Sequence, residues 1–276
     1  MTLHLDSPIS TFGTACTPIV AIHADQFEKF ITSASAIMRS WIAATGFVAK
    51  PHTHSLIPSA TGAIDTVLVG VGDVNDLFAL SHLPLTLPEA NYTFVPNAGS
   101  LNAYAAAFGW QMGSYQFSRY KKPLRQPAAL VMANSAETRH AVNTFISTKL
   151  IRDLVNTPSE DLGPEQMADC AQQLALEFGA IFREWAGDNL LKHNFPAIHA
   201  VGRASDRAPR LIELTWGEPK NPRVAVVGKG VCFDTGGVNI KGADGMRWMK
   251  KDMGGGAHAL GLARLIMAEK LPVYLH

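Results

Sequence analysis

Short apolar runs alternate with longer segments of helical periodicity along the chain. In the first half, three short runs predict buried strands at residues 66–71, 91–95 and 128–132, and the first of them is apolar and β-branched. The alanine-rich segment 101–112, which lies between the last two runs, predicts a helix. The amino-terminal half therefore reads as strands connected by helical segments.

The second half continues this alternation. A long helix is predicted from Ala136 to the Asn-Thr-Pro breaker that ends at Pro158. Another helix opens with Pro164 in its first turn and ends at Gly179. The remaining predicted elements are strands at residues 197–201, 211–215, 223–227 and 271–276, and a helix over residues 252–270.

This order of elements, with no internal repeat, predicts an α/β fold. We expect a small amino-terminal α/β domain over residues 1–134, a linking helix over 135–158, and a second α/β domain over 159–276 with a mixed, largely parallel sheet. Parallel strands are buried on both faces, yet no element follows the last predicted strand to cover it. We therefore expect this sequence to hold only the amino-terminal portion of the second domain.

Composition narrows the classes of protein. The 276 residues are 47% hydrophobic and 17% charged, which excludes an intrinsically disordered chain. A net charge of +1 argues against nucleic acid or an anionic membrane as partner, and the basic run 118–125 is interpreted as a solvated loop. Three scattered cysteines fit a reducing compartment. Without a signal-peptide pattern or an 18-residue apolar run, we expect a cytoplasmic protein.

The residues that carry chemistry lie in the glycine-rich segment 226–258. The predicted strand 223–227 leads into a loop with Lys229 and Asp234, at the strand end where open α/β sheets bind ligands. Asp252 stands at the start of the last predicted helix. Two aspartates in one crevice repel each other unless a cation lies between them, and hard divalent cations prefer carboxylate oxygens. The pattern indicates a metal site.

The two lysines of the glycine-rich loop suggest two different roles. A lysine ligates a metal as a neutral amine, and lowering its pKa from about 10.4 to near 7 costs roughly 4–5 kcal/mol, which a bond to a cation can offset. Lys229, directly after the predicted strand, is the better candidate for this role. Lys241, in a looser loop, is the better candidate for a charged group that stabilises an oxyanion.

Each of these residues also has a plainer interpretation. Taken singly, such lysines and aspartates are surface residues, and Asp252 would serve as a helix N-cap. The stretch Gly228-Lys-Gly230 lacks the Ser or Thr of a phosphate loop, and the glycines after residue 69 lack the third glycine of a dinucleotide fingerprint. His52 and His54 have no third zinc ligand nearby, so ordinary loop histidines are the preferred interpretation.

The segment from Val227 to Gly255, VGKGVCFDTGGVNIKGADGMRWMKKDMGG, resembles the signature of the leucyl aminopeptidase family, the M17 metallopeptidases. The family pattern reads approximately V-G-K-G-x-x-F-D-[ST]-G-G-x-x-[IL]-K-x-x-x-x-M-x-x-M-K-x-D-M-G-G, and its spacings agree throughout. The stretch Arg152-Asp-Leu-Val-Asn-Thr-Pro158 also resembles the family's interdomain segment. The likeness is specific from about residue 150 to 276, whereas the first 135 or so residues carry no distinctive motif.

The resemblance implies a role for each residue. Lys229, Asp234 and Asp252 correspond to metal ligands, with Asp234 bridging two divalent ions, Mn or Zn. Lys241 corresponds to the lysine that polarises the scissile carbonyl, and Met249 falls where the pocket for the first substrate side chain is lined. The implied reaction is hydrolysis of a leucine-like amino-terminal residue from a peptide substrate, with Asp234, Asp252, Lys241 and Met249 contacting that substrate. Members of the family are typically cytosolic hexamers.

One part of the family's site is missing from this sequence. The family completes its ligands with a later Asp-x-Glu-x-Arg stretch, whose arginine holds a bicarbonate. The nearest string here, Ser135-Ala-Glu-Thr-Arg139, has serine in place of the aspartate and precedes the predicted catalytic domain. With three protein ligands for two metals, we expect at best one weakly held ion and little or no activity from these residues alone. The alternative hypothesis is a non-catalytic scaffold or binding module derived from the family.

Overall fold

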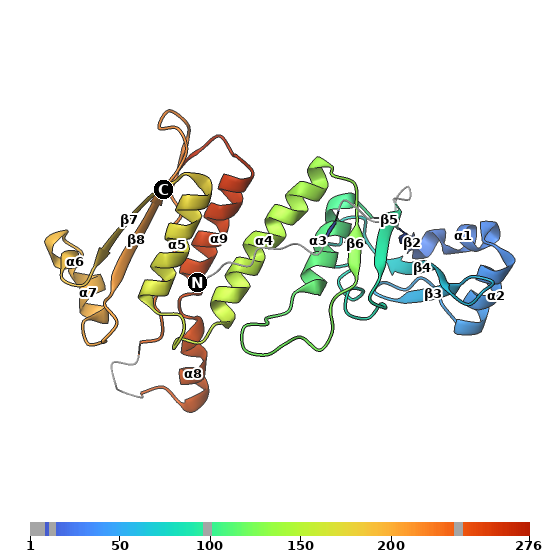
Figure 1. The fold of residues 1–276 in the computed structure, drawn as a ribbon, viewed down its shortest axis with the longest axis horizontal. Helices are drawn as coiled ribbons and strands as arrows, with labels where there is room; N and C mark the ends of the chain where they lie inside the picture. Colours follow the sequence, from blue (N-terminus) through green and yellow to red (C-terminus); the bar gives the residue numbers. More distant parts are fainter. Residues whose placement is uncertain (1–8, 11–14, 96–100, 235–239) are drawn as a thin grey trace. The chain divides into compact units, whose positions relative to one another are not determined.

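The computed structural model of the chain describes residues 9–10, 15–95, 101–234 and 240–276 (Figure 1). The described residues before Ser147 form one compact unit, called here the amino-terminal unit, and residues 147–276 form the carboxy-terminal unit. The long helix α4 (Ala136–Asn156) contains the point of division. The predicted α/β class is confirmed, and the mostly parallel sheet that the structure shows lies in the amino-terminal unit, while the expected domain limits stay a prediction.

The amino-terminal unit is built on a six-stranded sheet. Its strands are β1 (Ile9–Ser10), β2 (Thr17–His23), β3 (His54–Pro58), β4 (Ile64–Val71), β5 (Asn91–Val95) and β6 (Ala129–Val131). They follow the order β1-β6-β5-β2-β4-β3, and all neighbours pair in parallel except β3, which pairs antiparallel with β4. Val67, Leu68 and Val69 of β4 are fully buried because helices cover both faces of the sheet.

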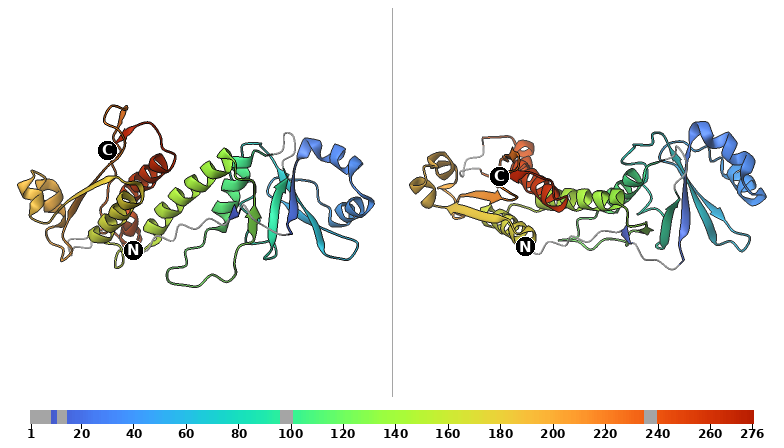
Figure 2. Two further views of the ribbon diagram at one scale, coloured as in Figure 1. Left: turned by 45° about the horizontal axis from the view of Figure 1, so that its top comes forward. Right: turned by 90° about the horizontal axis from the view of Figure 1, so that it is seen from above.

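Helices lie on both faces of this sheet (Figures 1 and 2). They are η1 (Ala24–Gln26), α1 (Phe27–Ser33), α2 (Ala36–Thr45) and α3 (Ala103–Ser114). On one face, Phe27 of α1 and Ile42 of α2 share a buried cluster with Ile22 and Leu68 of the sheet. On the other face lies α3, whose fully buried Trp110 donates a hydrogen bond from Nε1 to the carbonyl of Ala128 at 3.2 Å.

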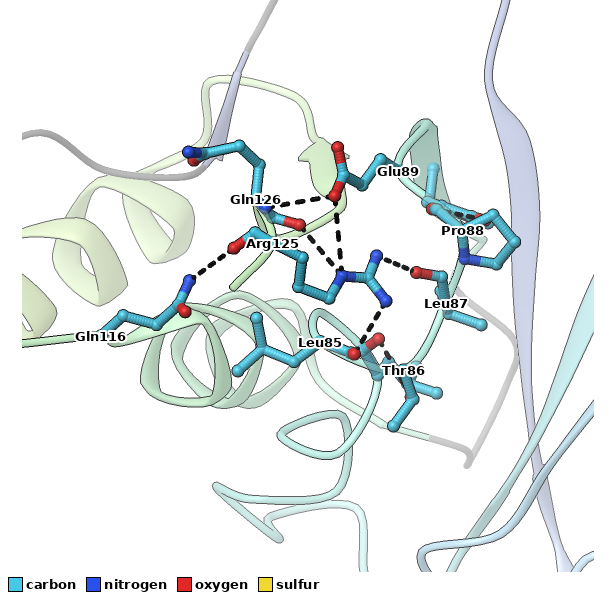
Figure 3. A network of polar contacts seen from close by, with 10 residues as sticks. Leu85, Thr86, Leu87, Pro88, Glu89, Gln116, Arg125 and Gln126 are labelled. Carbon is cyan, nitrogen blue, oxygen red and sulfur yellow. Dashed lines mark hydrogen bonds and ion pairs between the residues drawn. The ribbon is translucent and has the colours of Figure 1, made fainter. Parts of the chain in front are cut away.

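Arg125 anchors the end of the basic run 118–125 (Figure 3). Its guanidinium donates hydrogen bonds to the carbonyls of Leu85, at 2.8 Å, and Leu87, and its Nε lies 3.8 Å from Glu89 Oε1. The other basic residues of the run are exposed. The prediction of a solvated loop is therefore right for them and wrong for Arg125, because the turn carbonyls need a donor that the guanidinium supplies.

The carboxy-terminal unit has a core of its own. Leu150 of α4, Leu174 and Met253 lie in one buried cluster. Two small sheets, β7–β8 antiparallel and β9–β10 parallel, are joined by an isolated bridge between Trp216 and Leu275. The elements of this unit after α4 are α5 (Pro164–Phe178), β7 (Ile181–Ala186), α6 (Asn189–Lys192), α7 (Pro196–Gly202), β8 (Arg210–Thr215), β9 (Arg223–Val224), α8 (Ala243–Trp248), η2 (Met249–Lys251), α9 (Gly254–Ala268) and β10 (Tyr274–Leu275).

Two predictions about the carboxy-terminal unit are wrong. Residues 197–201, predicted as a strand, lie in α7, because a short apolar run has no distinguishing period and Pro196 favours a helix start. The buried strand predicted at 223–227 is shorter, since β9 ends at Val224 and Val227 is 94% exposed. In the part of the chain that the structure describes, β9 pairs only with β10, so no other strand continues this sheet beyond β9.

Three histidines, His52, His54 and His82, lie close together in the amino-terminal unit. The ring centroid of His82 lies 5.4 Å from that of His54 and 6.2 Å from that of His52. Both ring nitrogens of His82 are buried, and neither has a hydrogen-bond partner of good geometry among the described residues. Burial, and then repulsion from His54 and His52, lowers the pKa of His82 from 6.5 to about 4, against a small opposing effect of the Ala79 carbonyl.

This shift predicts loss of stability in mild acid. The unfolded chain protonates His82 near pH 6.5, and the folded chain does so only near pH 4. The contribution of neutral His82 to the free energy of unfolding is therefore complete above pH 6.5 and is lost as the pH falls towards 4. We expect the protection of residues 72–90 against hydrogen exchange, corrected for the intrinsic rate, to fall about tenfold or more between pH 7 and pH 5. His82→Leu should remove most of this dependence, and His193→Leu, in the other unit, should keep it. Equal protection at both pH values in the unaltered chain contradicts the prediction.

Candidate metal centre

Lys229 and Asp252 lie together although 23 residues separate them along the chain. Lys229 follows the edge strand β9, and Asp252 lies between η2 and α9. The distance from Lys229 Nζ to Asp252 Oδ2 is 3.1 Å, and the two side chains are 60% and 25% exposed. The structure thus places two of the three residues predicted as metal ligands in direct contact.

A close approach of two backbone segments fixes this pairing. The N–H of Gly256, in the first turn of α9, donates a hydrogen bond to the carbonyl of Lys229 at 2.7 Å. A Cβ at Gly228 would lie 2.2 Å from the carbonyl oxygen of Gly255, so only glycine fits there without movement of the backbone. The loop after β9 is therefore held against the start of α9. Asp252 lies two residues before the first residue of α9.

Asp252 does not cap α9, so the plainer interpretation of this residue is wrong. An N-cap residue has extended dihedral angles, whereas Asp252 has φ −66° and ψ −15° because η2 continues almost directly into α9. Met253 occupies the N-cap position and makes no side-chain hydrogen bond there. The carboxylate of Asp252 is directed to Lys229 instead.

Of the other predicted site residues, Met249 contacts this pair through its backbone carbonyl, which accepts a hydrogen bond from the N–H of Asp252. Asp234 and Lys241 are exposed and flank residues 235–239, which lie outside the described residues. Where the structure describes the chain, no hydrogen bond or ion pair joins either of them to Lys229 or Asp252. Met249 is only 8% exposed and lies in η2, three residues before Asp252. The roles of Asp234, Lys241 and Met249 stay predictions.

Cys232 lies between Lys229 and Asp234 in the sequence, and its thiol is partly buried. Burial raises the pKa of its thiol to about 11, because the charged thiolate is disfavoured away from water. The thiol lies 3.4 Å from the carbonyl oxygen of Gly230 and donates to it. Metals bind the thiolate rather than the thiol, so a metal would have to displace this proton before Cys232 could become a ligand.

Lys250 is a residue of this region that the sequence analysis missed. Its ammonium donates a hydrogen bond from Nζ to the carbonyl of Val155 at 2.9 Å, across a separation of 95 residues. Val155 belongs to the last turn of α4. No local pattern in the sequence predicts this contact, because its partner is a backbone carbonyl in a distant helix.

The donor set fits a divalent cation in part. An amine from Lys229 and carboxylates from Asp252 and Asp234 suit Mn²⁺ or Zn²⁺. In this structure the Lys229 side chain forms an ion pair with Asp252 at the position where a metal ion would lie. Metal binding must therefore break this ion pair, and the metal must bind lysine as the neutral amine. Among the described residues, no group of three or more His, Cys, Asp or Glu side chains is arranged to hold a metal, and this includes His52 and His54. The pair therefore needs further oxygen ligands to complete a site.

Two protein-family models match the chain. The model described as the cytosol aminopeptidase family, catalytic domain, matches residues 149–276. The model described as the M17 aminopeptidase, N-terminal domain, matches residues 17–133. The likeness thus extends over both compact units. No helix in the described ranges combines the length and the apolar character that a membrane span requires.

Individual relatives agree with the family models. A probable cytosol aminopeptidase of Rhodococcus opacus is 33% identical over 83% of this chain and 50% of its own length. The crystal structure of a cytosol aminopeptidase from Coxiella burnetii is 40% identical, with a TM-score of 0.88, over 97% of this chain and 59% of that chain. The bottromycin maturation enzyme BotP, in complex with Mn, is 28% identical with a TM-score of 0.76, over 95% and 58%. The chain spans about half the length of the curated relatives it matches.

Proposed function

Because the chain belongs to the M17 cytosol aminopeptidase family, we propose that it supplies part of the cation site of a metal-dependent aminopeptidase. The observation that carries this proposal is the contact between the Lys229 amine and the Asp252 carboxylate. The hydrogen bond from the N–H of Gly256 to the carbonyl of Lys229 holds the loop and the helix that bear these two groups together. The preference for a leucine-like residue, the bicarbonate, the hexamer and the cytosolic location are further parts of the proposal, and they rest on resemblance.

Lys229, Asp234 and Asp252 hold the cations in this proposal. A pair of divalent cations bound there would activate water and anchor the α-amino group of the peptide. Lys241 keeps its positive charge and stabilises the negative charge that develops on the scissile carbonyl oxygen. Met249 contacts the first side chain of the substrate from its place in η2.

Three protein ligands are too few for two cations. We therefore predict that the 276-residue chain alone hydrolyses leucine p-nitroanilide at or near the background rate, even with excess Mn²⁺, because each factor of ten in rate needs about 1.4 kcal/mol of transition-state stabilisation. Release of p-nitroaniline measures the rate. Efficient Mn²⁺-dependent hydrolysis by the purified chain contradicts our account of the ligand set.

A chimera tests whether these residues supply a working half of an aminopeptidase site. The chain is joined to the portion of the Coxiella burnetii enzyme that lies outside the aligned 59%. We expect Mn²⁺-dependent hydrolysis of leucine p-nitroanilide by the chimera, and a loss of kcat/KM on the order of 100-fold or more in its Lys229→Met variant. A folded chimera that binds Mn²⁺ but hydrolyses nothing favours the non-catalytic scaffold instead.

A further inference from the structure

Lys250 connects the turn before Asp252 to the end of a different helix. Its Nζ donates a hydrogen bond to the carbonyl of Val155 at 2.9 Å, in partly buried surroundings. Val155 lies in the last turn of α4, where the carbonyls have no partner within the helix and form the negative end of its dipole. A positively charged donor is the group that such a helix end favours.

The neighbours of Lys250 lie against the same helix. Met253 is 1% exposed and shares the buried cluster of Leu150 and Leu154 in α4. A Cβ at Gly254 would be in van der Waals contact with Val155 Cγ2, at 3.9 Å. The chain therefore crosses the end of α4 at η2 and the start of α9, and Lys250 supplies the polar contact at that crossing.

We infer that Lys250 is a positioning residue, which fixes the turn Met249–Lys251 on the end of α4 so that the Asp252 carboxylate faces Lys229. This inference rests on the proposed function. The backbone N–H of Asp252 donates a hydrogen bond to the carbonyl of Met249 at 3.0 Å, so movement of this turn moves Asp252 as well. Metal–ligand distances tolerate only about 0.2 Å, and a small displacement of the turn is enough to weaken a cation's binding.

The next residue provides a matched control. Lys251 carries the same side chain in the same short helix, but it is exposed and has no hydrogen bond or ion pair among the residues that the structure describes. A change at Lys251 removes the same charge from the neighbourhood of Asp252 without removing the contact to α4. Comparison of the two variants therefore separates the effect of losing the contact to α4 from the effect of losing a positive charge near Asp252.

The test compares the unaltered 276-residue chain with Lys250→Met, Lys250→Arg and Lys251→Met. Mn²⁺ affinity is measured by electron paramagnetic resonance, and hydrogen exchange is measured for residues 249–256. Lys250→Met is expected to weaken Mn²⁺ binding about tenfold or more and to speed exchange, because methionine keeps the apolar stem but cannot donate. Lys250→Arg should restore both properties to within about threefold, and Lys251→Met should change neither beyond that range.

The possible failures are distinguishable. An unaltered chain that takes up no Mn²⁺ contradicts the proposed function, and the inference about Lys250 is then decided by exchange alone. Unchanged exchange and affinity in Lys250→Met overturns the inference, as does an equal effect of Lys251→Met. If circular dichroism shows that Lys250→Met does not fold, Lys250→Leu, which likewise cannot donate and is a good helix former, replaces it with the same expected direction and the same overturning outcome.

Discussion

Asp252→Asn is expected to weaken Mn²⁺ binding on the order of 100-fold or more while the fold remains intact. The amide keeps the size of the carboxylate but loses the negative charge that a hard cation prefers. The ion pair that Asp252 makes with Lys229 contributes little to stability, because Lys229 is 60% exposed and solvent screens the pair. Calorimetric or paramagnetic titration with Mn²⁺ measures the affinity, and chemical denaturation measures the stability.

Asp244→Asn is the control for this change. Asp244 lies in α8, is 94% exposed, and pairs only loosely with Arg247, at 3.7 Å. Its substitution should leave Mn²⁺ affinity within about threefold of the unaltered chain, which corresponds to less than about 1 kcal/mol. Equal losses in the two variants would mean that the overall negative charge of this region, and not ligation by Asp252, attracts the cation.

Gly228→Ala is expected to separate the loop after β9 from the start of α9. The new methyl group would lie 2.2 Å from the carbonyl oxygen of Gly255, and a backbone atom cannot turn away as a flexible side chain can. Such overpacking typically costs about 1–3 kcal/mol of folding free energy. Because the hydrogen bond from Gly256 to Lys229 spans the same contact, we also expect Mn²⁺ affinity to fall about tenfold or more.

Gly230→Ala is the matched substitution, two residues further along the same loop. A Cβ at Gly230 would have no heavy atom within 4 Å, so its stability should stay level or rise slightly as the unfolded chain loses freedom. Denaturation curves and Mn²⁺ titrations of both variants decide the matter. Similar behaviour of the two alanine variants would show that the close approach at Gly228 is not what holds the site.

The elements that follow strong local rules were predictable from the sequence. α5 starts at Pro164 and ends before Gly179, which has a φ of 67°, as its sequence signals indicate. β2 was not predicted, and Pro18 inside it is a residue type that argues against a central strand. Proline fits here because the pairing of β2 with β4 begins only at Ile19. The backbone N–H that proline lacks is therefore not needed for a hydrogen bond to β4.

In the candidate site, the residues were predictable from the sequence, but their contacts were not. The continuous motif made Lys229, Asp234 and Asp252 recognisable as a set, since its spacings carry the information. The contacts that place two of them together were not predictable, because they join backbone atoms of distant segments. One example is the close approach of Gly228 to Gly255. Another is the hydrogen bond from the side chain of Lys250 to the carbonyl of Val155 at the end of α4.

Titration of the unaltered chain with Mn²⁺ at neutral pH, followed by the paramagnetic signal of the free ion, tests the central claim most directly. We predict weak, saturable uptake that approaches one ion per chain and is absent in Lys229→Met. A folded chain that leaves all Mn²⁺ free, or that binds it equally well after Lys229→Met, would contradict the claim that this amine and its neighbouring carboxylates hold a cation.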